Sequence, residues 1–347
     1  MIVASIVAAF SLNAVQGAIV PAYGGATAPR SADAQPLGVS KKGIHTATIL
    51  AFGDMMLDRS VRVAIEANGP EYPFAPLKDF LTGYDIVVAN AEGAFTSSSS
   101  VSVDNHALLQ FTFDPSELPT LKKLGFTLFS QANNHALNFG MSGLRQSQSL
   151  IRASGMETFG DPLNDNPGPY YQTVRGIKIA FVGYHQFSGT DTNVIAAIRQ
   201  SHAAGVFTIV YPHWGEEYLS TSTPFQQTKA HAFIDAGADL ILGAHPHVIE
   251  PIEIYKGKAI FYSLGNFIFD QSNTGPTSEG LSVGISLEPG TVSYTLFPLK
   301  ITRAQASVMG PPDQQRIFMT MAENAMLSGD EASLRNSIAG GYFSLVR

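Results

Sequence analysis

Five short polar segments of this sequence carry side chains that could bind metal ions, and each segment follows an apolar run. The segments are Gly53-Asp54, Asn90-Ala91-Glu92-Gly93, Asn133-Asn134-His135, His213-Trp214-Gly215 and Gly243-Ala244-His245-Pro246-His247. Neutral imidazole and carboxylate ligands suit Zn, Fe or Mn. An acid that bridges two such ions holds them about 3.5 to 4 Å apart, and a water between the ions becomes a hydroxide near neutral pH. The pattern therefore predicts a centre that holds one or two divalent ions.

Each segment also has a structural interpretation that the sequence alone does not exclude. Asp54 could cap a turn, and Glu92, an acid that is costly to bury unpaired, could cap a helix or form a salt bridge. Asn134 can bind a metal through its side-chain carbonyl while His135 donates a proton, or both could belong to a hydrogen-bonded loop. These alternatives stay open at this point.

The pair His245 and His247 is the strongest metal signal. The proline between them favours an extended conformation in His245, and in an extended loop alternate side chains point the same way. His213, beside the only tryptophan, could be a ligand or a core histidine packed on an aromatic ring. His185 follows another apolar run and could line the site, but it is left out of the predicted ligand set.

Alternating elements can bring these segments together. Near-continuous apolar runs predict buried strands at 47–52, 85–89, 127–131, 177–183, 206–211, 240–242 and 259–263. Helices are expected between them at 60–67, 116–124, 143–153, 192–204 and 223–236. This order predicts an α/β sheet with crossover connections, in which sites form beyond the carboxyl ends of the strands. Period-two patterns at 281–287 and 292–299 predict antiparallel edge strands, and weak helical patterns follow residue 303.

Composition narrows the class of protein. At 347 residues the chain can form one large α/β domain or two smaller ones. Charged residues make up 14%, and 32 Gly with 20 Pro indicate many loops. A net charge of -7 gives no general attraction to nucleic acid, which is not an expected partner. Because the sequence has no Cys, disulfides, thiolate metal sites and cysteine nucleophiles are excluded.

The N-terminal segment has the features of a targeting sequence. Residues 2–12 are apolar apart from two serines, and small residues follow them. We expect residues 1–20 to be a signal peptide or an N-terminal anchor, which makes the protein extracytoplasmic, either secreted or membrane-anchored. A disordered or core-packed N-terminus is the alternative. Residues 21–45, rich in Ala, Gly, Pro and Ser, are expected to be a flexible linker.

Six ordered motifs, at 53–57 with Arg59, 90–93, 132–137, 213–218, 243–251 and 262–271, resemble those of a known family. They are similar to the CapA family of poly-γ-glutamate capsule-synthesis proteins, a branch of the calcineurin-like metallophosphoesterase superfamily. The resemblance covers about residues 48–299. It implies a CapA-like metallophosphoesterase domain at 46–302, followed by a C-terminal extension at 303–347. The implied fold is a four-layer α/β/β/α sandwich, in which two mixed sheets pack face to face.

The resemblance also implies roles for individual residues. The metal-facing set would be Asp54, Glu92, Asn134, His213, His245 and His247. Asp54 and His135 would be the catalytic residues, with His135 as the general acid or as the group that stabilises developing charge. Arg59 and Asn266 would contact substrate or brace loops.

Three positions depart from the superfamily pattern. Met56 stands where a histidine is usual, Glu92 stands where the bridging acid is usually an aspartate, and Asn138 stands where an aspartate is expected. Losing one imidazole should weaken one metal site, and losing a charge at position 138 should affect how a ligand is oriented. Binding of a single ion is consistent with these changes.

Three functions follow from the resemblance. The first is a metal-dependent hydrolase of cell-envelope poly-γ-glutamate metabolism, in which metal-bound hydroxide attacks an amide carbonyl or a phosphoryl centre. Its expected partners are the anionic polymer or a phosphate ester, and membrane-bound capsule synthesis machinery. The second is a noncatalytic capsule assembly or export factor that binds the polymer. The third is a generic phosphodiesterase, against which Met56 argues.

Overall fold

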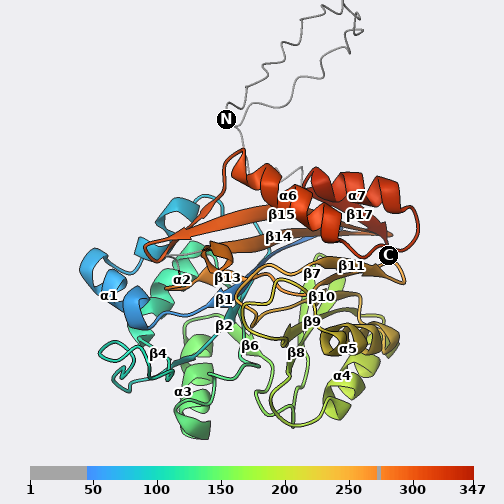
Figure 1. The fold of residues 1–347 in the computed structure, drawn as a ribbon. Coiled ribbons are helices and arrows are strands. Elements are labelled where there is room, and N and C mark those ends of the chain that lie inside the picture. The colour runs from blue at the N-terminus through green and yellow to red at the C-terminus, as the bar shows by residue number, and fades with distance from the viewer. Residues whose placement is uncertain (1–44, 272–274) are drawn as a thin grey trace, which may run out of the picture. The chain divides into compact units, whose positions relative to one another are not determined.

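The computed structural model describes residues 45–271 and 275–347 of the chain (Figure 1). The predicted targeting segment at 1–20, and the predicted linker except His45, lie outside these residues. Among the residues that are described, no helix is both long enough and apolar enough to cross a membrane.

The larger sheet has nine strands and carries the first half of the site. Its order is β16 (Gln305–Val308), β15 (Thr291–Thr302), β14 (Glu279–Glu288), β1 (Ala47–Met55), β2 (Ile86–Ala91), β5 (Leu128–Ser130) and β6 (Glu157–Phe159). In addition, β13 (Asn266–Ile268) pairs with β1, and β17 (Tyr342–Val346) pairs with β15. Strands β1, β2, β5 and β6 run parallel, whereas β14 and β15 form the predicted antiparallel pair.

The smaller sheet has six strands and carries the histidines. Its order is β11 (Ile252–Tyr255), β12 (Lys258–Phe261), β10 (Leu240–Leu242), β9 (Phe207–His213), β8 (Ile177–His185) and β7 (Tyr170–Val174). The central strands β12, β10, β9 and β8 are parallel, and both edge strands are antiparallel to their neighbours. A separate two-stranded pair joins β3 (Ala94–Phe95) to β4 (Thr112–Phe113). The mixed α/β class expected from the sequence is confirmed.

Three hydrophobic clusters explain how the layers hold together. One cluster combines apolar side chains of both sheets, which therefore pack on each other, and it also includes α6 (Asp313–Asn324) and α7 (Glu331–Ala339) residues. A second lies between the larger sheet and α1 (Arg59–Asn68), α2 (Leu118–Leu124), α3 (Gly140–Ala153) and η1 (Tyr72–Leu77). The third joins the smaller sheet to α4 (Thr192–Ala203) and α5 (Pro224–Asp235), which lie together beside β8 and β9 in Figure 1.

Local sequence signals explain where the helices begin and end. Asp58 caps α1, and Thr223 with Gln226 forms a capping box at the start of α5. Gly125 ends α2 in a left-handed conformation that glycine adopts without penalty. Residues after 303, expected to be a C-terminal extension, add β16 and β17 to the larger sheet.

A candidate metal centre between the two sheets

The candidate site lies at the carboxyl ends of the central strands of both sheets. Three predicted strands are longer than expected, because β1 continues to Met55, β8 to His185 and β9 to His213. Asp54, His185 and His213 are therefore the last or nearly the last residues of strands, where the strand fixes their positions. In the parallel pairs, Asp54 lies opposite Asn266 and His185 lies opposite His213.

A close approach of two backbones positions Asp54. The amide of Asp54 donates to the carbonyl of Gly265 at 3.0 Å. A Cβ at Gly53 would lie 1.8 Å from that same carbonyl oxygen. Only glycine fits at position 53, so the Gly-Asp pair of the first motif brings β1 against the segment that contains Asn266.

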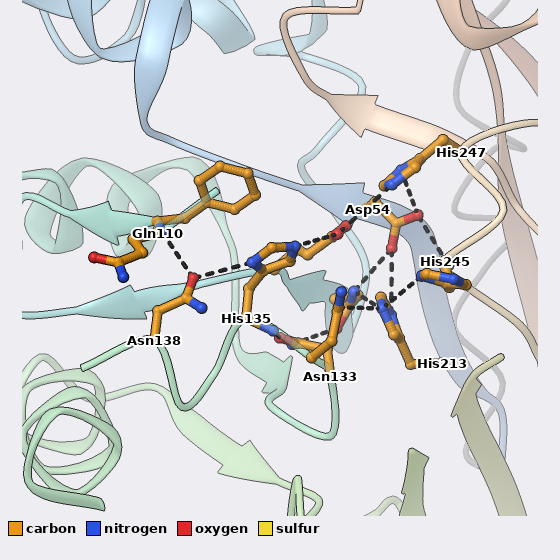
Figure 2. Close-up of polar contacts among 12 residues, drawn as sticks. Asp54, Gln110, Asn133, His135, Asn138, His213, His245 and His247 are labelled. Atoms are coloured by element: carbon orange, nitrogen blue, oxygen red, sulfur yellow. Dashed lines mark hydrogen bonds and ion pairs between the residues drawn. The ribbon is translucent and has the colours of Figure 1, made fainter. Parts of the chain in front are cut away.

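The carboxylate of Asp54 is the centre of a hydrogen-bond network (Figure 2). It accepts from the Nδ2 of Asn90 at 2.8 Å and from the amide of His245 at 3.0 Å. The Nδ1 atoms of His247 and His213 lie 3.4 and 4.0 Å from its oxygens. Asp54 does not cap a turn in this structure, because its bonds run to strand and loop residues far along the chain.

A second group of ligand atoms converges on His213. Its Nε2 lies 2.8 Å from the Oδ1 of Asn134 and 3.1 Å from the Nδ1 of His245. His213 is buried, and its ring centroid is 4.6 Å from that of His245. One nitrogen cannot donate to both neighbours at once, whereas a cation among the three atoms would satisfy all of them.

The predicted extended conformation of His245 is wrong. His245 has a φ of 99° and His247 a φ of 60°, so both lie in the left-handed region, which non-glycine residues rarely adopt. Both side chains nevertheless reach the site, because the tight turn is held by the bond from His245 to Asp54 and by the main-chain bond between Trp214 and Ala244. Strained backbone of this kind is typical of ligand-binding positions.

Glu92 is the clearest sign that a cation belongs here. It is 1% exposed, and neither of its carboxylate oxygens has a hydrogen-bond partner among the described residues, although the Nε2 atoms of His247 and His135 lie 3.7 and 3.8 Å from its Oε1. Single ligand atoms of Asp54, Glu92 and His247 lie within 4.8 Å of one another. Moving an ionised carboxylate from water into the protein interior costs on the order of several kcal/mol of free energy, unless a nearby cation compensates its charge. The residues therefore fit a divalent ion.

Burial and neighbouring charges set the protonation of the site. Burial raises the pKa of Glu92 well above its usual value, although nearby His247 opposes this effect. Burial alone would lower the pKa of His247, but Glu92 and Asp54 outweigh it and raise that pKa to about 9. For His213 and His245, burial and then the neighbouring imidazoles lower the pKa, to about 3 for His245. The two acids therefore favour the charged form of His247, whereas the charged forms of His213 and His245 are disfavoured.

His135 lies apart from His213, His245 and His247 in the site (Figure 2). Its Nε2 is 3.8 Å from Glu92, and its Nδ1 is 3.0 Å from the Oδ1 of Asn138. Because Asn138 Oδ1 also accepts from the Phe111 amide, we assign it as the acceptor and Nδ1 of His135 as the donor. Burial lowers the pKa of His135 to about 4, which leaves its Nε2 as a free base.

The remaining predicted residues brace the site. Arg59 is 8% exposed, pairs with Asp270 and lies between the rings of Phe111 and Phe269. Asn266 accepts from the Nδ1 of His247 at 3.0 Å. Met56 is buried, and its sulfur accepts a bond from the amide of Asp58.

Sequence reasoning missed four residues of the site. Glu217 lies within a second group of possible ligands with His245 and His247. Asn90 and Asn133 connect the strand ends, since Asn133 donates to Asn90 at 3.0 Å. His185, left out of the ligand set, is buried 5.9 Å from the ring of His213, and its Nε2 has no partner among the described residues. The sequence did offer signals for them, since Asn90, Asn133 and Glu217 lie in the motifs that resemble the family and His185 lies at a strand end.

A family model described as "Bacterial capsule synthesis protein PGA_cap" matches residues 48–271, which is more than half of the chain. The chain belongs to this family. The resemblance to CapA proteins is confirmed, and the PGA_cap match includes all the residues of the candidate centre.

Curated relatives support the same assignment. The "PGA biosynthesis protein CapA" of Bacillus subtilis (strain 168) is 32% identical over 73% of this chain and 71% of its own length. The "Capsule biosynthesis protein CapA" of Bacillus anthracis is 27% identical over 80% of this chain and 73% of its own length. A "Probable polyglutamine synthesis accessory protein" of Mycobacterium tuberculosis is 24% identical over 69% of this chain and 72% of its own length.

Proposed function

We propose that this PGA_cap protein is a metal-dependent hydrolase that acts on the γ-glutamyl amide bonds of an extracytoplasmic capsule polymer, poly-γ-glutamate. The observation that carries the proposal is the buried Glu92, which has no hydrogen-bond partner among the described residues and is grouped with Asp54 and His247 as a possible metal ligand. Relatives named for capsule and PGA biosynthesis supply the polymer. The proposal includes that the protein is secreted or membrane-anchored and that it acts beside membrane-bound capsule synthesis machinery.

The donor set fits one or two divalent ions. Asp54, Glu92 and His247 would hold one ion, and Asn134, His213 and His245 would hold another. These nitrogen and oxygen ligands suit Mn, Fe or Zn. When bound, such an ion supplies positive charge that polarises a carbonyl or phosphoryl oxygen.

The protein's own residues would handle protons and orientation. His135 is neutral, with the proton on Nδ1 held by Asn138, so its Nε2 can take a proton from the attacking water and return it to the leaving nitrogen. Asn266 and Asp54 fix the ring of His247, and Asn90 fixes the carboxylate of Asp54. Arg59, paired with Asp270, would hold the loops around the site rather than bind substrate.

The test is metal content by mass spectrometry of protein purified without chelator. Wild type should carry at least about one divalent ion per chain, and His245→Ala and His247→Ala should carry far less. His106→Ala is the matched control, because His106 lies in an exposed loop and should leave the content unchanged. Metal-free wild type whose thermal stability does not respond to added Mn or Zn would remove the basis for the hydrolase.

A noncatalytic assembly factor is the second candidate. The observation that favours it is the names of the relatives, which refer to biosynthesis and not to degradation. Such a factor would bind the polymer, and His135→Ala would leave its function intact. Generic phosphodiesterase activity would instead appear as turnover of simple phosphate esters with Mn.

A further inference from the structure

Glu217 lies in the motif at 213–218 but was not among the predicted ligands, and it belongs to a second group of possible ligands. One carboxylate oxygen of Glu217 and one ring nitrogen each of His245 and His247 lie within 4.8 Å of one another. His247 is shared with the buried group of Asp54 and Glu92. The two groups therefore form one continuous set of donors, in which Glu217 is the exposed member.

Backbone contacts hold Glu217 close to the histidine turn. The amide of the next residue, Tyr218, donates to the carbonyl of Pro246 at 2.8 Å. Tyr218 has a φ of 68°, and its hydroxyl accepts from Gln271 at 3.0 Å. A non-glycine residue persists in the left-handed region only where its surroundings fix it. The hydrogen bonds of Tyr218 therefore hold Glu217 beside His245 and His247.

The exposure of Glu217 complements the buried ligands. Asp54, Glu92 and His247 approach from the interior, and a centre with three protein ligands keeps an open position. Glu217 comes from the solvent side, which is the side from which a polymer would also arrive.

We propose that Glu217 is a carboxylate ligand that closes the metal centre from the solvent side and that an oxygen of the incoming anionic substrate must displace. This inference rests on the proposed function, since it needs a metal ion at the centre. It adds a ligand and a competition with substrate that the family motifs do not assign.

Three variants of the whole chain test it. Glu217→Gln removes the charge, Glu217→Asp keeps the charge but shortens the side chain, and Glu216→Gln removes an equal charge from the adjacent exposed residue outside the ligand group. Dissociation constants for Mn²⁺ and Zn²⁺ are measured by competition with a chelator, and Co²⁺ absorption reports the ligand geometry. Thermal unfolding shows that each variant is folded.

Direct ligation predicts that both Glu217 variants bind metal about tenfold or more weakly and change the Co²⁺ spectrum. Glu216→Gln should stay within about twofold of wild type, because an exposed charge that does not contact the ion is screened by solvent. Equal weakening in Glu216→Gln and Glu217→Gln, or wild-type affinity in Glu217→Asp, would show a general charge effect and overturn the inference.

The outcomes separate this inference from the proposed function. Wild-type protein that binds neither ion overturns both. Wild-type protein that binds metal, beside a Glu217→Gln variant with unchanged affinity and an unchanged Co²⁺ spectrum, overturns only the role of Glu217. A folded Glu217→Gln variant with weaker metal binding and unaltered Glu216→Gln supports it.

Discussion

His135 is the residue whose chemistry the structure constrains most. The resemblance implied a general acid or a group that stabilises developing charge, but a neutral imidazole with its proton on Nδ1 has only a lone pair at Nε2. It must first accept a proton before it can donate one. An aspartate at position 138 would have stabilised the charged ring, and Asn138 gives the ring orientation without that charge.

Replacing His135 with alanine should separate catalysis from metal binding. We expect a loss of about 10²- to 10⁴-fold in kcat on γ-glutamyl amides, because the proton acceptor is removed, with unchanged metal content. The measurement is steady-state hydrolysis beside metal analysis, with His106→Ala as the control. An undiminished kcat would assign the reaction to other groups and favour the assembly factor.

The loop between β10 and β11 carries another buried acid, Glu250, which is not among the predicted metal ligands. It is 2% exposed, and its Oε2 accepts from the Nε2 of Gln226 in α5 at 2.6 Å. Burial raises the pKa of Glu250 to about 8, although the bond from Gln226 opposes this, from an ordinary value of 4.5. The folded protein therefore holds this proton more tightly than the unfolded chain does.

This shift predicts how stability changes with pH. Between pH about 4.5 and 8 the unfolded chain loses the Glu250 proton while the folded protein keeps it, so the free energy of unfolding falls as pH rises. Glu250→Gln has no carboxyl proton to lose. Its free energy of unfolding should exceed that of wild type by on the order of a few kcal/mol at pH 8, but by little at pH 4.5. Urea unfolding of metal-free protein at both pH values checks this. Glu288→Gln, on an exposed side chain, should show no such pH dependence, and an equal difference at both pH values would contradict the assignment.

The elements could be predicted from the sequence where their signals are local. Runs of apolar residues located the parallel strands of the larger and smaller sheets except β6 and β13, and 240–242 was predicted with the bounds of β10. The pair β3 and β4 was missed, because a two-residue strand has no period to detect, and the five-residue β17 was missed as well. The candidate ligands followed from strand ends, whereas Glu217 depends on how the turns at Tyr218 and His245 meet, and that contact is tertiary. The left-handed φ of His245 has the same origin, since its bond to Asp54 outweighs the local preference before proline.

On the scale of the whole molecule, the candidate site is rich in acids and so is the protein. The chain carries a net charge of -7, and Asp54, Glu92 and Glu217 face the centre. The nearby cation Arg59 is already paired with Asp270. An anionic polymer would be repelled by these acids, so bound metal ions would have to supply the attraction.

Polymer binding should therefore depend on metal. Fluorescence anisotropy of labelled poly-γ-glutamate should show binding to metal-loaded wild type. Binding should be at least about tenfold weaker after chelation and in His245→Ala, because both changes remove positive charge from the site. Binding should weaken as salt is raised, since screening reduces the attraction between the ions and the carboxylates. His106→Ala should bind as wild type does. Equal affinity with and without metal would mean that another surface binds the polymer. The acids of the candidate site would then bind a different ligand.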